Sequence, residues 1–358
     1  MQPEIARLIG TRALVATVAG ALLLLAACAA PSAQPAAGAA APSAGGASAA
    51  PPAAAAPAPA AARPPLQPLR IGIPQASLSY LPAHVAWKRG FFEEEGLAVE
   101  FPLVTGNAIM PALLSGEIDF TTNLSSIGAH AGQGGESRIV QFHAVRLQHV
   151  LIVRPDVTDV QQLSGKRIAV QSPGTLPAFQ AQKLAERYAL RDIALVSTGS
   201  EGRAALEAGA VDAAVTGVPE NLIAERNGFP TLLRFGTFLD IPQAGLGTSE
   251  AELRDKPDLI QRALRASARA LPLLQSQRDE IVRMIAAWIE LSPEDAARAF
   301  DLVADTYSAN GIPTEAQQRA YLGLLQETAN VPPEATPDWI FDFTLARRVA
   351  TELGLPSQ

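Results

Sequence analysis

The sequence predicts an α/β protein with two similar lobes followed by a helical segment. From about Leu66, short apolar stretches alternate with amphipathic ones, which indicates strands joined by helices and a parallel sheet. The same order of stretches returns about 95 residues later. Beyond residue 250, apolar residues recur at three- and four-residue spacing, as in helices. With 48% hydrophobic and 18% charged residues, the chain can form a sizeable core and is not disordered throughout.

Residues 1–27 have the features of an export signal, with a charged start, a short apolar run and small residues at its end. The apolar run of about 15 residues is shorter than the roughly 20 that span a bilayer as a helix. Leu-Ala-Ala-Cys at 25–28 is similar to the lipobox of bacterial lipoproteins, which predicts that Cys28 is lipidated and anchors an extracytoplasmic protein to the membrane. A plain secretory signal or a tilted membrane anchor is the alternative.

Residues 28–65 are predicted to form a tether. From residue 29 to residue 65, 29 of 37 residues are Ala or Pro, and Arg63 is the only charged residue. Proline breaks every candidate helix, and there are no large apolar side chains to form a core. We therefore expect a semi-extended segment that holds a globular body away from a membrane.

Residues 66–150 are predicted to form the first part of lobe I, and residues 151–242 to form lobe II. In lobe I we expect strands at 69–73, 97–104 and 118–122, a helix that ends near Gly90, and a helix at 107–115. Three stretches are echoed in the same order, with 70–73 repeated at 167–170, 103–106 at 195–199, and 112–119 at 205–212. The last pair shares Ala-Leu-x-x-Gly-x-(Ile/Val)-Asp, which general similarity among α/β units does not explain.

Residues 243–358 are predicted to contain a return crossover and C-terminal helices that pack on lobe I. Helices are expected at 258–288, 293–306, 314–328 and 339–353, with starts marked by Ser292-Pro293 and Thr314. Two segments should cross between the lobes, one within 145–155 and the other within 241–248. Gly245 and Gly247 in the second could act as a hinge. The alternative is that these two glycines relieve crowding in a strand.

Several classes of function are disfavoured by composition and by missing motifs. The net charge is −7 and no basic cluster is present, which argues against nucleic-acid binding. With Cys28 as the only cysteine, a disulfide framework within the chain is impossible. The phosphate-binding loop, the His-Glu-x-x-His motif and the Gly-x-Ser-x-Gly elbow are absent. His143 and His149 are too far apart along one strand to share a metal. We expect neither catalytic residues, nor a metal, nor a cofactor.

Polar loops follow the predicted strands of both lobes, where ligands bind in open α/β sheets. These loops carry hydroxyls, amides and glycines with few charges, which suits hydrogen bonding to a small molecule. The predicted ligand-binding residues are Ser77, Tyr80, Thr105, Asn107, Asn123 and Ser125 in lobe I, and Ser172, Gly174, Thr175, Thr216, Gly217, Pro219 and Glu220 in lobe II. For any single residue, helix capping is the alternative explanation, and Tyr80 could instead belong to the core.

Four segments of the chain resemble the substrate-binding proteins of ABC importers. The similarity is to the branch that includes nitrate, sulfonate, taurine and pyrimidine-precursor binders. The segments are 86–97 (Ala-x-x-x-Gly-Phe-Phe-x-x-Glu-Gly-Leu), 114–120 (Leu-Ser-Gly-Glu-Ile-Asp-Phe, which resembles Leu-x-x-Gly-Glu-Ile-Asp-Phe), 163–175 (Leu-x-Gly-Lys-x-Ile-Ala-Val…Pro-Gly-Thr) and 208–214. The resemblance implies the two-lobed type II periplasmic-binding fold, with a small-molecule ligand between the lobes and an ABC permease as partner. We expect the protein to be a monomer.

The ligand and the role stay open at this stage. Enzymes of thiamine-precursor synthesis resemble this branch in fold, but they depend on a cysteine cluster that a chain with only Cys28 lacks. This favours binding over catalysis. A sensory lipoprotein and an extracytoplasmic enzyme are the alternatives to transport. The predicted loops contain no arginine, although Arg203 lies one helical turn beyond Ser200 and Arg146 lies in the first crossover. A sulfonate, a carboxylate and a pyrimidine-like heterocycle are therefore all candidate ligands.

Overall fold

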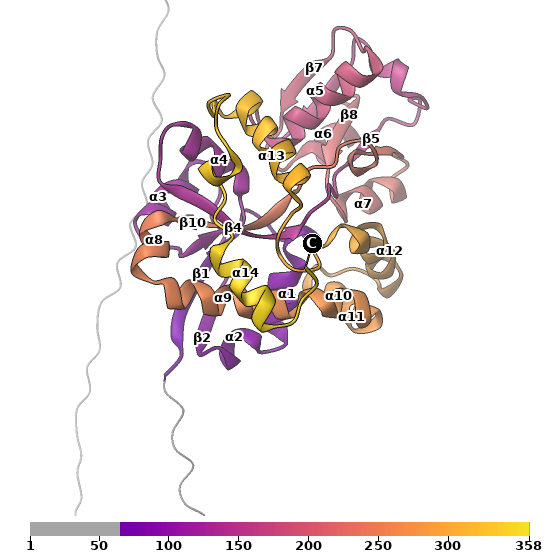
Figure 1. Cartoon of the computed structure of the whole chain (residues 1–358). Coiled ribbons are helices and arrows are strands. Elements are labelled where there is room, and N and C mark those ends of the chain that lie inside the picture. The colour runs from indigo at the N-terminus through magenta and orange to yellow at the C-terminus, as the bar shows by residue number, and fades with distance from the viewer. Residues whose placement is uncertain (1–64, 358) are drawn as a thin grey trace, which may run out of the picture. The chain divides into compact units, whose positions relative to one another are not determined.

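The computed structural model describes residues 65–357, and within this range the strands form two five-stranded sheets (Figure 1). We call each sheet with its helices a lobe. In spatial order, the lobe I sheet consists of β2 (Leu97–Glu100), β1 (Gln67–Gly72), β3 (Phe120–Thr121), β10 (Ala244–Ser249) and β4 (Ser137–Ala144). The lobe II sheet consists of β7 (Ala194–Ser197), β6 (Arg167–Val170), β8 (Ala213–Thr216), β5 (Val150–Val153) and β9 (Thr231–Arg234).

Helices follow most strands and dominate the C-terminal part of the chain. Lobe I contains α1 (Leu81–Lys88), α2 (Phe91–Glu94), α3 (Ile109–Leu114) and α4 (Leu124–Gly132), and lobe II contains α5 (Leu176–Tyr188), α6 (Gly202–Glu207) and α7 (Glu220–Arg226). The C-terminal helices are α8 (Glu250–Asp255), α9 (Pro257–Arg269), α10 (Leu271–Ser276), α11 (Arg278–Trp288), α12 (Pro293–Val303), α13 (Glu315–Thr328) and α14 (Thr344–Glu352). Short 3-10 helices are η1 (Leu78–Tyr80), η2 (Gly106–Ala108), η3 (Val160–Leu163), η4 (Phe235–Thr237), η5 (Ala304–Thr306) and η6 (Pro337–Trp339).

The repeat predicted from the sequence is present in both sheets. The parallel set β2-β1-β3 of lobe I has its counterpart in β7-β6-β8 of lobe II. In lobe I the carboxylate of Asp119 accepts a hydrogen bond from the backbone N–H of Arg70 at 2.8 Å. In lobe II Asp212 accepts from the backbone N–H of Arg167 at 2.9 Å. The repeated aspartate therefore satisfies a backbone donor of the first repeated strand in each lobe, β1 and β6, and the α/β fold prediction is confirmed.

The prediction of a parallel sheet is correct only for these repeated strands. β5 runs antiparallel to β8 and β9, and β10 runs antiparallel to β3 and β4. Both strands directly follow a crossover between the lobes, at residues 145–149 and 235–243. The repeated strands end at the cleft, whereas a strand that comes from a crossover begins there. A strand that follows a crossover therefore runs antiparallel to the repeated strands. Both sheets thus contain parallel and antiparallel pairs.

The glycines of β10 are packing residues, which corrects the hinge prediction. A Cβ at Gly245 would clash with the backbone oxygen of Gln141 and lie 2.8 Å from the Cα of Phe142. A Cβ at Gly247 would lie 2.5 Å from the Cγ1 of Ile127. Both residues are buried in a strand that pairs with β4 through two register shifts. These contacts support the alternative explanation, relief of crowding in a strand.

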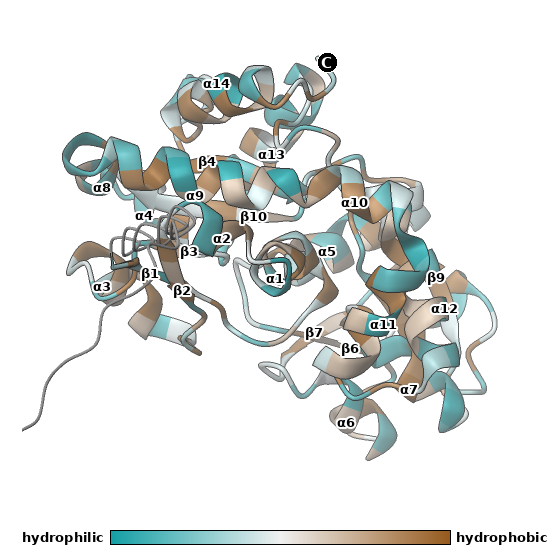
Figure 2. Ribbon diagram, turned by 90° about the horizontal axis from the view of Figure 1, so that it is seen from below, coloured by the Kyte–Doolittle hydropathy of each residue, from teal (hydrophilic) through white to brown (hydrophobic). Residues whose placement is uncertain are grey.

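The C-terminal segment is more finely divided than predicted and contacts both lobes. The helix expected at 258–288 is three helices. Pro272 at the start of α10 lacks the N–H that would continue the hydrogen-bonding pattern from α9, and Gln277 leaves the helical conformation between α10 and α11, with φ −127° and ψ 45°. α9 has an amphipathic pattern (Figure 2), and its Arg265 pairs with Glu95 after α2 at 2.8 Å. In addition, α12 pairs with α7 of lobe II through Arg226 and Asp295 at 2.6 Å. These lobe II contacts go beyond the expected packing on lobe I.

Two predicted helix starts are confirmed by their caps. Ser292 accepts a hydrogen bond from the backbone N–H of Asp295 at the start of α12, with Pro293 as the first helical residue. Thr314 and Gln317 form a capping box at the start of α13.

The predictions for the signal segment 1–27, for Cys28 and for most of the tether concern residues outside the described range. Among the described residues, none of the helices combines the length and the apolar composition needed to cross a membrane.

Candidate functional site

Two adjoining cavities lie between lobe I and lobe II. The lobe I cavity has a volume of about 100 Å³, and the lobe II cavity has a volume of about 340 Å³. They share five lining residues, so we treat them as two parts of one cleft. The shared residues are Gln75, Ser77, His149, Gln171 and Pro177.

The cleft brings together eight of the thirteen residues predicted from the sequence. The lobe I cavity is lined by Ser77, Tyr80, Asn123 and Ser125, and the lobe II cavity by Ser77, Thr216, Gly217, Pro219 and Glu220. Most of these residues follow β1, β3 or β8, so the carboxyl ends of these strands do face the space between the lobes. Asn123 also caps α4, because its side chain accepts from the backbone N–H of Ser126 at 3.2 Å.

Five predicted residues lie outside both cavity linings. Thr105 and Asn107 are exposed and lie at the start of and within η2, after β2, an edge strand of the lobe I sheet. The loop with Ser172, Gly174 and Thr175 is held by its own contacts, since the hydroxyl of Thr175 donates to the carbonyl oxygen of Ser172 at 2.6 Å. A Cβ at Gly174 would lie 3.3 Å from the carbonyl oxygen of Thr328, which places this loop beside the end of α13.

The sequence analysis overlooked polar residues in the two crossovers. His149 ends the first crossover and Gln243 ends the second, and both line the lobe I cavity. Both residues are polar and lie in segments that the sequence predicted to join the lobes, and this combination could have identified them as binding residues. Gln75 and Gln171 were within the predicted loops but were not chosen as binding residues.

A hydrogen-bond network joins the crossovers at the base of the cleft. Gln243 accepts from the backbone N–H of Gln148 at 2.6 Å through Oε1, and its Nε2 donates to the hydroxyl of Ser79 at 2.9 Å. Ser79 in turn donates to Gln148 Oε1 at 2.9 Å, and Gln148 Nε2 donates to the hydroxyl of Thr306 at 2.8 Å. The network therefore links η1, both crossovers and the C-terminal segment.

This network also fixes the protonation of His149. The amide of Gln243 is oriented by its Oε1, which accepts from the backbone N–H of Gln148. The Nε2 of Gln243 is therefore a donor, and it lies 3.4 Å from Nε2 of His149. Nε2 of His149 is thus assigned as the acceptor in this contact. The other ring nitrogen, Nδ1, then carries the proton and donates to Gln180 Oε1 at 2.9 Å. Burial lowers the pKa of His149 to about 4, which keeps the imidazole neutral at pH 7.

The wall of the lobe II cavity carries a compact charge cluster. Arg203 donates from Nε to Glu220 at 2.6 Å and from Nη1 to both carboxylate oxygens of Glu207 at 3.0 Å. These contacts, the one with Glu220 most of all, raise the pKa of Arg203. The arginine is therefore already matched by two carboxylates of the protein itself.

On the lobe I side, burial raises the pKa of Tyr80, so this phenol is protonated at neutral pH. Within residues 65–357, no cluster of three or more His, Cys, Asp or Glu residues is arranged to hold a metal ion. The cleft thus offers mainly hydroxyls, amides, one neutral imidazole and aromatic rings, a chemistry suited to binding a small polar molecule.

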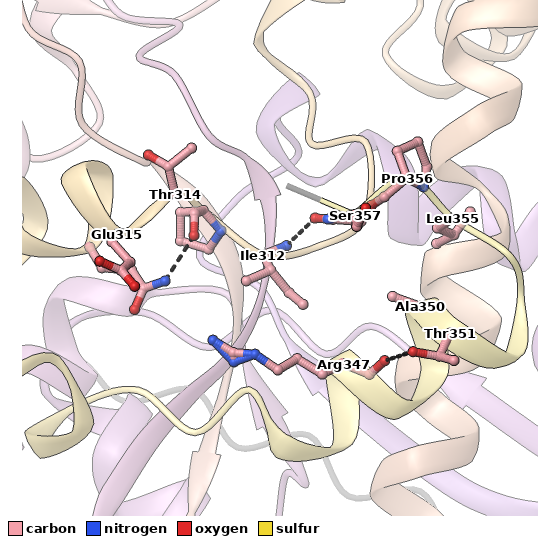
Figure 3. A pocket seen from close by; sticks show the side chains of 12 residues that line it. Ile312, Thr314, Glu315, Arg347, Ala350, Thr351, Leu355, Pro356 and Ser357 are labelled. Carbon is pink, nitrogen blue, oxygen red and sulfur yellow. Dashed lines mark hydrogen bonds between the residues drawn. The ribbon is translucent and has the colours of Figure 1, made fainter.

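A further cavity of about 610 Å³ lies near the C-terminus, lined by residues such as Thr314, Glu315, Arg347 and Ser357 (Figure 3). Some of its polar groups are engaged with one another, as in the 2.8 Å hydrogen bond from Asn310 Nδ2 to the carbonyl oxygen of Pro356. None of the predicted binding residues lines it. The cleft between the lobes is therefore the candidate functional site.

Solved structures with the same fold include two periplasmic binding proteins. The nitrate-binding protein NrtA from Synechocystis PCC 6803 has a TM-score of 0.66 and 14% identity, over 80% of this chain and 89% of NrtA. The aliphatic sulphonate-binding protein SsuA from Escherichia coli has a TM-score of 0.63 and 21% identity, over 77% of this chain and 92% of SsuA. The desulfurization enzyme DSZB also shares the fold, with a TM-score of 0.57 and 16% identity over 80% of this chain and 99% of that protein. At these identities the likeness concerns the fold.

Two comparisons concern the sequence itself. YtlA of Bacillus subtilis (strain 168), which carries the name of a binding protein, is 30% identical over 129 residues, or 34% of this chain and 39% of YtlA. The chain thus spans about two fifths of the length of that curated relative. The model of the NMT1/THI5 like family matches residues 78–281, more than half of the chain. The chain therefore belongs to the NMT1/THI5-like family.

Proposed function

We propose that the protein is the extracytoplasmic solute-binding component of an ABC importer. It captures a small organic molecule in the cleft and delivers it to a permease in the membrane. Sulfonates, carboxylates and pyrimidine-like heterocycles are the solute classes that the sequence leaves open. The names of NrtA and SsuA, both binding proteins with this fold, support a role in solute binding.

The observation that carries the proposal is that both lobes and both crossovers contribute residues to the same cleft. Ser77 and Asn123 come from lobe I, Thr216 from lobe II, and His149 and Gln243 from the crossovers. A solute that hydrogen-bonds to all of these segments interacts more strongly when the lobes are close together. The solute shifts the equilibrium toward the closed state by the difference between its affinities for the closed and the open state. A permease can recognise the closed state as the loaded one.

Release of bound compounds tests the proposal. Purified protein is incubated with the small-molecule fraction of a complex growth medium, washed and denatured, and the released compounds are identified by mass spectrometry. We expect one compound to be retained in stoichiometric amount. The Asn123→Ser variant keeps a residue that caps α4 but loses the amide that faces the lobe I cavity. Its affinity for that compound, measured by calorimetry, should be weaker by about 1–3 kcal/mol.

The matched control replaces a capping serine with asparagine at a helix start that lies away from both cavities. Ser292→Asn replaces one capping residue with another at the start of α12. This variant should bind the compound as the unmodified protein does. If no compound is retained by any variant, or if Asn123→Ser binds normally, the proposed site is incorrect.

We further propose that the protein acts as a monomer that is anchored to the membrane by a lipid on Cys28. The motif at residues 25–28 supports the anchor, and the Ala/Pro-rich tether would let the globular body reach a permease. Cys28→Ala should move the exported protein from the membrane fraction to the soluble fraction, as followed by immunoblotting. Cys28→Ala protein that stays in the membrane fraction would argue for a membrane anchor of another kind.

A further inference from the structure

We infer that the cleft selects solutes that carry no net negative charge and that donate hydrogen bonds. The inference rests on the proposed function and narrows its solute class. Three features of the described residues carry it: the charges that line the two cavities, the state of the helix starts at the cleft, and the acceptors that face the space between the lobes.

The charged side chains that line the cavities are Arg203, Glu201 and Glu220, so their formal sum is +1 − 2 = −1. Arg203 is the only cation among the lining residues of either cavity, and it is engaged by Glu220 at 2.6 Å and by Glu207 at 3.0 Å. A bound anion would compete with these two carboxylates and would also experience repulsion from Glu201. Glu201 is exposed, so salt screens its repulsion, whereas Arg203 is partly buried and its charge is already matched by the two carboxylates.

Helix starts are the other usual source of positive potential for anions, and here a side-chain cap or a carboxylate lies at three of the four. The start of α4 is capped by the side chain of Asn123, and α7 begins with the carboxylate of Glu220. Glu201 occupies the N-cap position of α6. The start of α5 has no side-chain cap, since Thr175 bonds to Ser172 instead. The starts of α5, α6 and α7 have no side-chain cap, but a carboxylate lies at two of these three starts and opposes an anion there.

The groups that remain for a solute in the cleft include several acceptors and flat walls. Both ring nitrogens of His149 are already engaged, Nδ1 with Gln180 at 2.9 Å and Nε2 with Gln243 at 3.4 Å, so His149 offers a solute its ring face and not an acceptor. Glu201 and Glu220 add carboxylate oxygens. Tyr80, Tyr321 and His149 place three aromatic rings around the lobe I cavity. A flat, neutral or cationic molecule with N–H donors matches these groups, whereas a sulfonate or a carboxylate offers only acceptors.

Three probes of nearly equal shape separate charge from size. Benzamidine is a cation with N–H donors, benzamide is neutral with the same kind of donors, and benzoate is an anion without them at pH 7. In calorimetry or thermal-shift titrations of the purified protein, benzamidine should bind about tenfold or more tightly than benzoate, with benzamide between them. The preference for benzamidine should weaken as salt is added.

Glu220→Gln tests the source of this preference, because it keeps the size of the side chain and removes its charge. The gap between benzamidine and benzoate should shrink several-fold in this variant. Glu315→Gln makes the same change in net charge on the start of α13, outside the cleft, and should leave the gap unchanged. Together the two variants show whether the preference depends on the carboxylate in the cleft or on the net charge of the protein.

Benzoate that binds as tightly as benzamidine would overturn the inference, as would a Glu220→Gln variant with an unchanged gap or a lack of binding of all three probes. The proposed function fails on a separate result, namely retention of no solute from the growth medium. An anionic solute retained in the cleft would support the proposed function and overturn the present inference alone.

Discussion

Replacing Gly245 with alanine is expected to lower the free energy of unfolding by about 3 kcal/mol. The added methyl group would overlap the backbone oxygen of Gln141 and lie 2.8 Å from the Cα of Phe142, and neither backbone atom can move without opening the β10–β4 ladder. β10 lies between β3 and β4, so a change there affects the lobe I sheet as a whole. Chemical denaturation followed by circular dichroism measures the loss.

Gly323→Ala is the matched control for this prediction. Gly323 lies in α13, and a methyl group added there would have nothing within 4 Å, so alanine should stabilise the protein by about 0.5–1 kcal/mol through its helix propensity. If Gly245→Ala kept full stability and instead changed the radius of gyration in X-ray scattering with and without solute, the hinge interpretation would be restored.

The second large effect is a loss of stability in mild acid. Burial lowers the pKa of His143 to about 3, of His84 to about 4 and of His149 to about 4. In the unfolded chain these histidines titrate near pH 6.5. Between pH 6.5 and about 4 the unfolded state therefore binds protons that the folded state does not, and stability falls as the pH falls. Each histidine contributes about 1.4 kcal/mol per pH unit in this window, and little above pH 7.

His143→Gln isolates one part of this effect. His143 is fully buried, and its Nε2 lies 2.8 Å from the hydroxyl of Ser267, a contact that a neutral glutamine amide could replace. Unfolding free energies are measured from pH 8 to pH 4.5 for both proteins. The loss of stability over this range should be about a third smaller in this variant than in the unmodified protein. The flat region between pH 7 and pH 8 is the internal control. An equal decline in both proteins would show that His143 does not carry the predicted share.

The local features of this protein could be predicted from its amino-acid sequence alone. The repeated Gly-x-(Ile/Val)-Asp segments, the helix starts at Ser292 and Thr314, and the alternation of strands and helices depend on neighbours within a few residues. Caps, left-handed glycines and hydrophobic periodicity act over such short distances, so they can be recognised in the chain alone. The same holds for the loops after β1, β3 and β8 that line the cleft.

The tertiary structure decided how distant segments meet. The direction of β5 and β10 follows from which sheet the chain enters after each crossover, and the role of Gly245 follows from the closeness of β4. The hydrogen bond between Ser79 and Gln148 joins residues 69 positions apart, and that between His149 and Gln243 joins residues 94 positions apart. The type of a residue determines which hydrogen bonds its side chain can form. The partners and the protonation state of His149, however, depend on how the two lobes and their crossovers pack. Such packing arises from contacts that are remote in sequence, and no local pattern encodes them.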